Sequence, residues 1–414
     1  MKKFLLMLAL LCIFFSYTVK ASTPKPPEVS ADGAILMDAK SLQILYSKNI
    51  DTSYPPASTT KIMTALLTFE KCNLDDLVTV GKNPPLADGS KIYIHVGEKL
   101  TVEQLLHGLL LSSANDCAET LAEYMAGSKE NFAKMMNQRA KELGCTNTNF
   151  VNPSGLYNKE HKTSAKDLAL IMNELVKHEE YIKIAKTSSY KIPKTNKMSE
   201  ERPLWNGNRL IQSCSGYYYK YCEGGKTGYT VQSLHSYVAS AKKDGHRLIV
   251  ALVHDGHKTF FKDAPLLFNY GFDNFESLKL YSKGDTIDNY EINDNSKIPI
   301  NINEDFYYSF LKNQYQKDKT KVELKIEDLE NKTIKKGTVI GKCLITYDNK
   351  TIGMAEVTAG SNYTPKEILG INMNFAKTKS KNSLYTYLLF ALGILFISII
   401  SMRIIRKRKA KKNS

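Results

Sequence analysis

The spacing of hydrophobic residues changes along the chain, from helical periods to short β-type segments and then to strict alternation. Dense apolar residues over 58–69 predict a buried helix, and helices are also predicted over 102–126 and 129–143. A further helix is predicted over 164–178, where Ser164 provides an N-cap and apolar residues recur one turn apart. This part of the chain is therefore expected to be mainly helical.

Short strands are predicted on either side of the helical region. Two lie within 34–46, and apolar runs over 237–241 and 248–253 predict a hairpin of core strands. The segment 226–228 is expected to begin the first strand of that hairpin. Strands, helices and strands again predict one α/β (α+β) unit over residues 29–275.

The last third of the chain has a different pattern. Hydrophobic and polar residues alternate over 322–326 and 339–345, which predicts a small all-β domain over 276–368. The polar residues 369–383 are expected to link this domain to the segment that follows.

Both ends of the chain have the pattern of segments that direct a protein to, or anchor it in, a membrane. Two lysines, a short apolar run and a small-residue cleavage site predict a signal peptide over 1–21. Residues 384–402 are 19 uncharged positions, about 28 Å of helix, which predicts a transmembrane helix whose basic flank, 403–414, stays cytoplasmic. We therefore expect an exported, single-pass cell-membrane protein with its catalytic domain outside the cytoplasm. The alternatives are an uncleaved N-terminal anchor and a buried core helix.

Charge and cysteine content argue against nucleic-acid binding and against a disulfide scaffold. Of the formal net charge of +15, the two ends hold most, and residues 22–383 carry only +5, so no nucleic-acid partner is expected. The six cysteines beyond residue 21 are not closely spaced as in a disulfide scaffold, and they include no metal-binding C-x-x-C pair. Free buried thiols are expected, with a Cys214–Cys222 bridge across a short Tyr-rich hairpin as the alternative.

A serine and a lysine lie at the start of the first predicted helix. Ser58 and Lys61 are three residues apart, so they share one helix face, one turn apart. A lysine in an apolar wall loses its charge more easily, and a neutral amine can accept the proton of a serine hydroxyl. The same spacing occurs by chance elsewhere, for example at Ser188, so the motif needs support from its surroundings.

Two further motifs provide that support. Ser113 and Asn115 lie at a break after an apolar run, and Lys226, Thr227 and Gly228 follow a glycine pair that lets a backbone approach a ligand closely. Ser-x-x-Lys, Ser-x-Asn and Lys-Thr-Gly in this order characterise penicillin-binding proteins and β-lactamases.

The stretches that carry these motifs resemble the D-alanyl-D-alanine carboxypeptidases, the low-molecular-mass penicillin-binding proteins. They read PPASTTKIMTALL, LLLSSANDCAETLAEY, FVNPSGL and GGKTGYT, and the resemblance covers residues 29–275. It implies a penicillin-binding-protein/β-lactamase-like transpeptidase fold, peptidoglycan stem peptides ending in D-Ala-D-Ala as substrate, and covalent binding of β-lactams. It implies no cofactor and no metal.

The resemblance also implies roles for single residues. Ser58 would attack the carbonyl between the two D-alanines, Lys61 would be its general base, and Ser113 would pass a proton to the leaving D-alanine. The substrate would be bound by the other motif residues and their neighbour, which are Asn115, Lys226, Thr227, Gly228 and Tyr229. Tyr229 would contribute its backbone N–H to an oxyanion hole, together with that of Ser58.

One departure from the family pattern stands out. Members often carry an arginine shortly before the closing Gly-Phe, near the substrate carboxylate, where this chain has Lys258 and Lys262. Three functional alternatives remain: a β-lactamase of the same fold, a DD-endopeptidase that cuts cross-links, and a non-enzymatic sensor. The aromatic run Tyr217-Tyr218-Tyr219 with Tyr221 is expected to pack on a hairpin, with lining of the cleft mouth as the alternative.

Overall fold

The computed structural model describes residues 24–293, 296–329 and 332–365. Residues 24–328 and 335–361 belong to one compact unit, and a second unit begins with 329–334 and continues from 362. In the described part of the second unit, Ile334 and Tyr363 form an isolated antiparallel bridge. The predicted signal peptide and transmembrane helix lie outside the described residues. Within these residues, no helix is long and apolar enough to cross a membrane.

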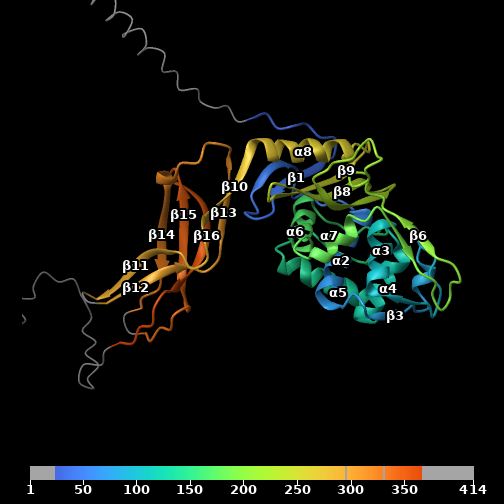
Figure 1. Cartoon of the computed structure of the whole chain (residues 1–414), viewed down its shortest axis with the longest axis horizontal. Helices are drawn as coiled ribbons and strands as arrows, with labels where there is room; N and C mark the ends of the chain where they lie inside the picture. Colours follow the sequence, from blue (N-terminus) through green and yellow to red (C-terminus); the bar gives the residue numbers. More distant parts are fainter. Residues whose placement is uncertain (1–23, 294–295, 330–331, 366–414) are drawn as a thin grey trace, which may run out of the picture. The chain divides into compact units, whose positions relative to one another are not determined.

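A five-stranded antiparallel sheet with strand order β2-β1-β9-β8-β7 organises the N-terminal part of the chain. Its strands are β1 (Gly33–Asp38), β2 (Ile44–Lys48), β7 (Cys222–Thr230), β8 (Leu234–Lys243) and β9 (His246–Asp255). Figure 1 shows helix α8 (Phe260–Asn274) over one face of this sheet and helices that include α2 (Lys61–Lys71) and α6 (Ala165–Leu175) on the other.

The sheet separates two hydrophobic cores, because successive side chains of a strand point to opposite faces. In β9, Ile249, Ala251 and Val253 pack on the side of α2 and α6. The alternate residues Leu248 and Val250 pack with the apolar face of α8. Both faces of strand β9 are therefore buried, which explains why its sequence is a continuous apolar run.

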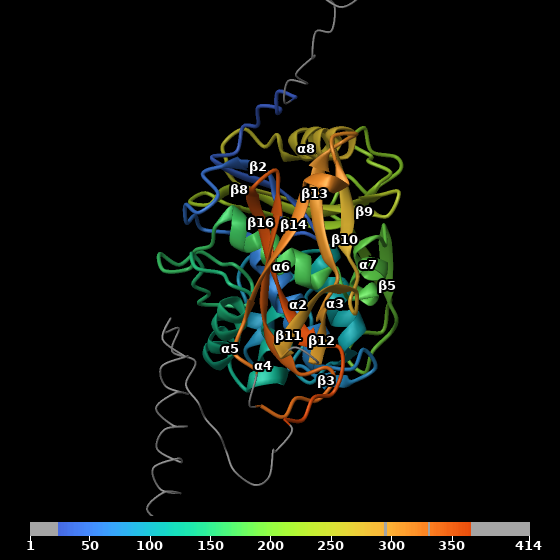
Figure 2. The ribbon, with the colours of Figure 1, turned by 90° about the vertical axis from the view of Figure 1, so that its left-hand side faces the viewer.

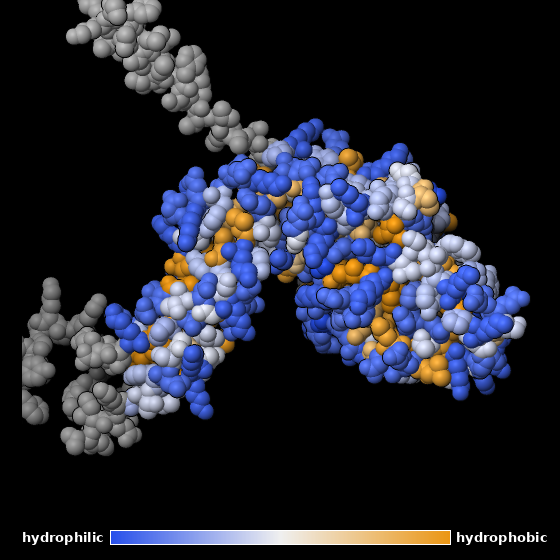
Figure 3. Space-filling view, in the orientation of Figure 1, coloured by the Kyte–Doolittle hydropathy of each residue, from blue (hydrophilic) through white to orange (hydrophobic). Residues whose placement is uncertain are grey.

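The remaining elements of this part surround the larger core. They are η1 (Ala57–Thr60), β3 (Leu77–Thr79), η2 (Pro84–Leu86), β4 (Lys99–Thr101), α3 (Val102–Leu111), α4 (Asn115–Ala126), α5 (Lys129–Glu142), α7 (Glu179–Ala185), β5 (Ser189–Ile192) and β6 (Arg202–Trp205). Strand β3 pairs with β4, and β5 pairs with β6. On the face seen in Figure 3, hydrophilic residues predominate and hydrophobic ones show in small groups.

The C-terminal part consists mainly of strands. Strands β11 (Thr286–Asn293), β12 (Ser296–Ile302), β14 (Thr320–Ile326), β15 (Val339–Tyr347) and β16 (Lys350–Ala359) form a sheet of order β11-β12-β16-β15-β14. Strands β14, β15 and β16 run side by side in Figure 1, and Figure 2 shows β14 and β16 of this sheet from another direction. A second, two-stranded sheet pairs β10 (Phe275–Tyr281) with β13 (Phe306–Leu311), and a short helix η3 (Lys317–Lys319) precedes β14. The alternating pattern in the sequence correctly predicted this β-rich region.

Two details of the predicted elements were wrong. The segment 226–228 lies inside a separate strand, β7, which pairs antiparallel with β8, so the hairpin is one part of a three-stranded meander. Three glycines within β7 weaken its β-type pattern, which hides the strand in the sequence. The predicted helix 102–126 is two helices, because Ser113 adopts a positive φ of 59° between α3 and α4.

The Tyr-rich segment is not a hairpin but part of the loop between β6 and β7. Tyr219 and Tyr221 pack on the rings of Phe268 and Phe272 of α8, whereas Tyr217 lines a cleft, so both predictions are partly right. The described cysteines are free thiols, as expected, but only Cys117, Cys222 and Cys343 are buried, whereas Cys72 and Cys145 are partly buried and Cys214 is exposed.

Candidate active site

Ser58 lies in the tight turn η1 that leads into α2. The residue before it, Ala57, has a φ of +49°, a left-handed conformation that costs a side-chain-bearing residue on the order of 1 kcal/mol. Its carbonyl oxygen accepts a hydrogen bond from Thr60 Oγ1 at 2.8 Å. Gly155, itself at a φ of +87°, lies so close that a Cβ there would collide with the Ala57 carbonyl. The strained turn is therefore held from two sides.

Lys61 is fully buried one turn after Ser58. Its Nζ lies 3.1 Å from Ser58 Oγ and 2.6 Å from both Asn115 Oδ1 and the Ser154 carbonyl oxygen. Burial lowers the pKa of Lys61 well below its usual value, and the positive charge of Lys226 lowers it further. The amine is therefore poised to lose its charge beside the serine hydroxyl.

The break between α3 and α4 brings the second motif to the same place. Ser113 reaches the cleft from this break, and Asn115 begins α4 with its side chain bonded to Lys61. The other end of the Asn115 amide, Nδ2, donates to the Asp88 carbonyl at 2.5 Å, and its backbone N–H donates to Ser90 at 2.6 Å. Asn115 thus connects the lysine to the loop that forms one cleft wall.

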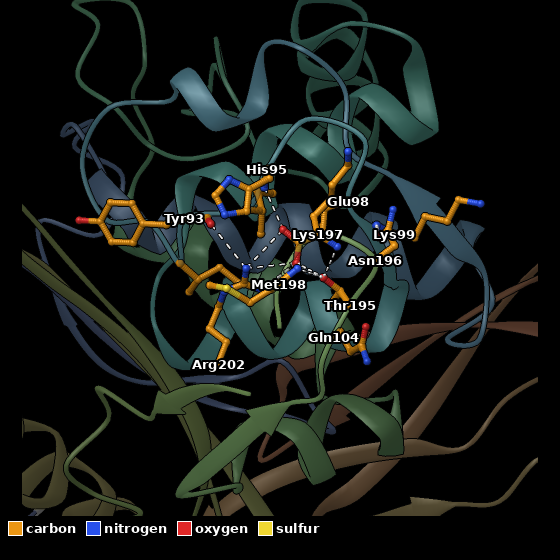
Figure 4. Close-up of polar contacts among 12 residues, drawn as sticks. Tyr93, His95, Glu98, Lys99, Gln104, Thr195, Asn196, Lys197, Met198 and Arg202 are labelled. Atoms are coloured by element: carbon orange, nitrogen blue, oxygen red, sulfur yellow. Dashed lines mark hydrogen bonds and ion pairs between the residues drawn. The ribbon is translucent and has the colours of Figure 1, made fainter. Parts of the chain in front are cut away.

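That loop is fastened by two buried carboxylates. Asp116 accepts backbone N–H groups of Ile92 and Ile94. Glu98 forms an ion pair with Arg202 at 3.1 Å and also accepts from the His95 backbone N–H and Thr195 Oγ1, a network drawn in Figure 4. Because both charges of the pair are buried and well bonded, removal of one partner would leave a costly uncompensated charge.

Strand β7 forms the opposite wall. A Cβ on Gly228 would lie 2.8 Å from the Pro56 carbonyl oxygen and 2.9 Å from the Ser58 backbone nitrogen, so only glycine allows this approach. Lys226 is buried behind the wall, its Nζ donates to the Thr227 carbonyl at 2.9 Å, and burial lowers its pKa to about 7. Tyr229 is 57% exposed and stacks on His235.

A cleft of about 860 Å³ joins these elements. The structure thus brings all three predicted motifs together: Ser58, Ser113, Thr227, Gly228 and Tyr229 line the cleft, while the buried Lys61, Asn115 and Lys226 lie close behind it. The other lining residues are Ser90, Gly207, Arg209, Tyr217, His235, Lys258, Thr259, Phe260, Phe261 and Lys262.

His161 is not among the residues predicted for the site, yet it supports the turn before Ser58. His161 Nδ1 accepts the Val151 backbone N–H at 3.0 Å, so its proton sits on Nε2, which donates to Thr60 Oγ1 at 2.8 Å. Thr60 in turn donates to Ala57, as described above. Burial and the nearby Lys61 lower the pKa of His161 to about 4, which keeps it neutral. No motif in the sequence marks this residue.

Fold and site together define a class of serine hydrolase in which a lysine, rather than a histidine, lies beside the serine. The chain belongs to the D-alanyl-D-alanine carboxypeptidase family of serine peptidases, which matches residues 20–256. Residues 275–364 match the penicillin-binding protein 5, C-terminal domain family. The transpeptidase fold with a C-terminal β domain and the enzyme class predicted from the sequence are thereby confirmed.

Individual relatives agree with this assignment. D-alanyl-D-alanine carboxypeptidase DacF of Bacillus subtilis is 32% identical over 337 residues, which are 80% of this chain and 85% of that protein. The crystal structure of penicillin-binding protein 5 from Haemophilus influenzae is 28% identical with a TM-score of 0.70, over 82% of this chain and 99% of that one. A Streptomyces DD-transpeptidase structure is 31% identical with a TM-score of 0.54, over 60% of this chain and 99% of that one.

Proposed function

We propose that this enzyme removes the terminal D-alanine from peptidoglycan stem peptides through an acyl-enzyme on Ser58. The observation that carries this proposal is the 3.1 Å contact between Ser58 Oγ and a fully buried Lys61 Nζ. A neutral amine has two N–H groups and one lone pair. If the N–H groups serve the two 2.6 Å contacts, to Asn115 and Ser154, the lone pair faces the Ser58 hydroxyl.

Acylation then moves a proton from Ser58 to Lys61 and delivers a proton to the leaving nitrogen. Ser58 Oγ bonds to the carbonyl carbon, its proton passes to Lys61 Nζ, and the backbone N–H groups of Ser58 and Tyr229 stabilise the oxyanion by about 3 kcal/mol each. The carbon–nitrogen bond breaks as the leaving nitrogen receives a proton through the Ser113 hydroxyl, and D-alanine departs. Water then attacks the ester, transfers a proton to the lysine–serine pair and restores Ser58.

The substrate would bind as an added strand. Strand β7 is the last strand of its sheet, so its outer edge offers backbone groups to an extended peptide. Asn115 and Thr227 would hold the backbone and terminal carboxylate, and Gly228 leaves room for the peptide. Lys226 would add positive potential below its pKa of about 7 and lose it above.

The sequence supports a location for this activity. We propose that 1–21 is a signal peptide and that 29–275 is the catalytic domain. The all-β domain (276–368) and linker (369–383) would lift the cleft toward the wall, while 384–402 anchors the protein in the cell membrane.

The decisive experiment labels the protein with a fluorescent penicillin and maps the modified peptide. We expect the label on Ser58, no label on Ser58→Ala, and normal labelling of Ser188→Ala, which removes the exposed chance match to the same spacing. D-Alanine release from a pentapeptide ending in D-Ala-D-Ala should follow the same pattern. A label on another residue would refute the proposal.

The same experiment separates the alternatives of the same fold. A β-lactamase would release the penicillin quickly, whereas a carboxypeptidase should keep it attached long after labelling. A DD-endopeptidase would split cross-linked dimers into monomers rather than release free D-alanine from a pentapeptide. Labelling of Ser58 without any hydrolysis would point to a sensor.

A further inference from the structure

Arg209 differs from the other arginines of the described residues in lacking a carboxylate partner. Arg139 pairs with Glu70, Arg202 with Glu98, and Arg247 with Glu223. The exposed Arg209 instead lies over the ring of Tyr217, 5.9 Å from its centroid, and lines the cleft. Its guanidinium is therefore available to an anion that enters the cleft.

The backbone that carries Arg209 is held firmly. The buried Asn208 accepts hydrogen bonds from the Leu210 backbone N–H at 3.1 Å and from the Tyr237 hydroxyl at 2.9 Å. Its own N–H donates to Asn206 Oδ1 at 2.9 Å. Since both neighbours of Arg209 are buried, the side chain projects from a fixed point into the cleft.

Ring contacts connect Arg209 to the strand pair that includes Thr227. Tyr217, which its guanidinium covers, contacts the ring of Phe261 at 5.8 Å. The adjacent Phe260 stacks at 5.3 Å on Tyr237, and Tyr237 is the direct cross-strand partner of Thr227. A connected aromatic group thus links Arg209 to the strand that would hold the end of the substrate.

The charges that line the cleft have one sign. They belong to Arg209, Lys258 and Lys262, and the lining includes no aspartate or glutamate. A guanidinium can hold a carboxylate with two parallel hydrogen bonds, whereas each lysine acts as a point charge. Tyr217 orients the guanidinium without neutralising it, which suits recognition of a carboxylate rather than a structural ion pair.

We propose that Arg209 is a specificity-determining residue that binds the C-terminal carboxylate of the substrate. This inference rests on the proposed function, because it assumes a peptide whose last residue lies just beyond the carbonyl attacked by Ser58. Arg209 thereby supplies, from the loop before β7, the bidentate group that the lysines at 258 and 262 cannot provide.

The test compares two pentapeptides, one ending in the free D-Ala-D-Ala carboxylate and one in its C-terminal amide. For the acid, Arg209→Gln should lower kcat/KM about tenfold to a hundredfold, mainly through KM, and Arg209→Lys should recover little of that loss. For the amide, wild type and Arg209→Gln should react at equal rates. Lys262→Gln, which removes another cation that lines the cleft, should lose less than Arg209→Gln on the acid.

Three outcomes would overturn the inference. An equal loss on acid and amide would mean that Arg209 supports the loop or reads a carboxylate elsewhere in the stem peptide. Full recovery by Arg209→Lys would mean that charge alone matters, and an unchanged Arg209→Gln would mean that it does not bind substrate. Failure of the proposed function is distinguishable, because wild type would then release no D-alanine and Ser58 would carry no penicillin.

Discussion

At the scale of single residues, the site depends on a lysine that the fold makes easy to deprotonate. Lys61 is fully buried, and Lys226, whose positive charge also lowers the pKa of Lys61, is buried as well. Two buried amines destabilise each other's charged form, so burial and repulsion act in the same direction. Asp116 and Glu119 oppose this effect only weakly compared with burial.

This environment predicts how acylation depends on pH. The pKa of Lys61 is lowered, so the reactive neutral amine is the major form above that pKa and is lost as pH falls through it. The rate constant for penicillin acylation should therefore rise with pH through the lowered pKa of Lys61 and level off above it. Lys61→Arg, which stays protonated, should be slower by at least about a hundredfold.

The control for this series is Lys71→Ala, an exposed lysine on the same helix. Its acylation profile should match that of wild type. A pH-independent acylation rate in folded wild-type protein would contradict the role given to Lys61.

Motif residues and supporting residues differ in how visible they are in the sequence. Ser58, Lys61 and Ser113 were found because their spacing is short and fixed by one helix or one break. His161 and Arg209 were not, since each meets the site only through tertiary contacts made by loops. Nothing local in the sequence distinguishes them from other surface or core residues.

At the scale of elements, the turn η1 depends on the close approach of Gly155. Both Gly155 (φ +87°) and Gly144 (φ +80°) have left-handed backbone, but only a Cβ on Gly155 would strike the Ala57 carbonyl, whereas Gly144 has nothing within 4 Å. Gly144→Ala should therefore lower the free energy of unfolding only through backbone strain, by on the order of 1 kcal/mol.

Gly155→Ala should cost more stability and also slow acylation, because displacement of Ala57 moves the Ser58 hydroxyl. A shift of about 1 Å can lower a rate about a hundredfold. Thermal unfolding and penicillin acylation measured on both variants check this. Equal acylation rates for the two variants would show that the turn does not need this contact.

Helices and strands were predicted correctly where one face or both faces of the element are buried, and incorrectly where glycines interrupt the hydrophobic pattern. Ser164 caps α6 through its side chain, as its position predicted, and β9 matches its apolar run. Strand β7 was not predicted as a strand separate from β8, because its glycines serve close approach and weaken its strand propensity.

At the scale of the whole molecule, location is a prediction from the terminal sequences. Truncation after residue 383 should release the protein from membranes, because it removes the uncharged 384–402 segment and its basic flank. A membrane-impermeant penicillin should label the full chain in intact cells. Fractionation measures the first effect, and gel fluorescence the second.

The matched control removes only residues 403–414. It should stay with the membrane fraction if the apolar segment is the anchor. Retention of the protein truncated after residue 383, even after a high-salt wash, would instead assign the membrane association to another part of the chain.

The exposed thiol of Cys214 gives this enzyme a ready attachment point for a reporter dye. Burial raises the pKa of Cys72 to about 11, and Cys117, Cys222 and Cys343 are enclosed, so a maleimide at neutral pH should react first at Cys214. Cys214 belongs to the same loop as Arg209 and Tyr217. Fluorescence from a dye attached there would report substrate arriving at the cleft in real time, without any engineered cysteine.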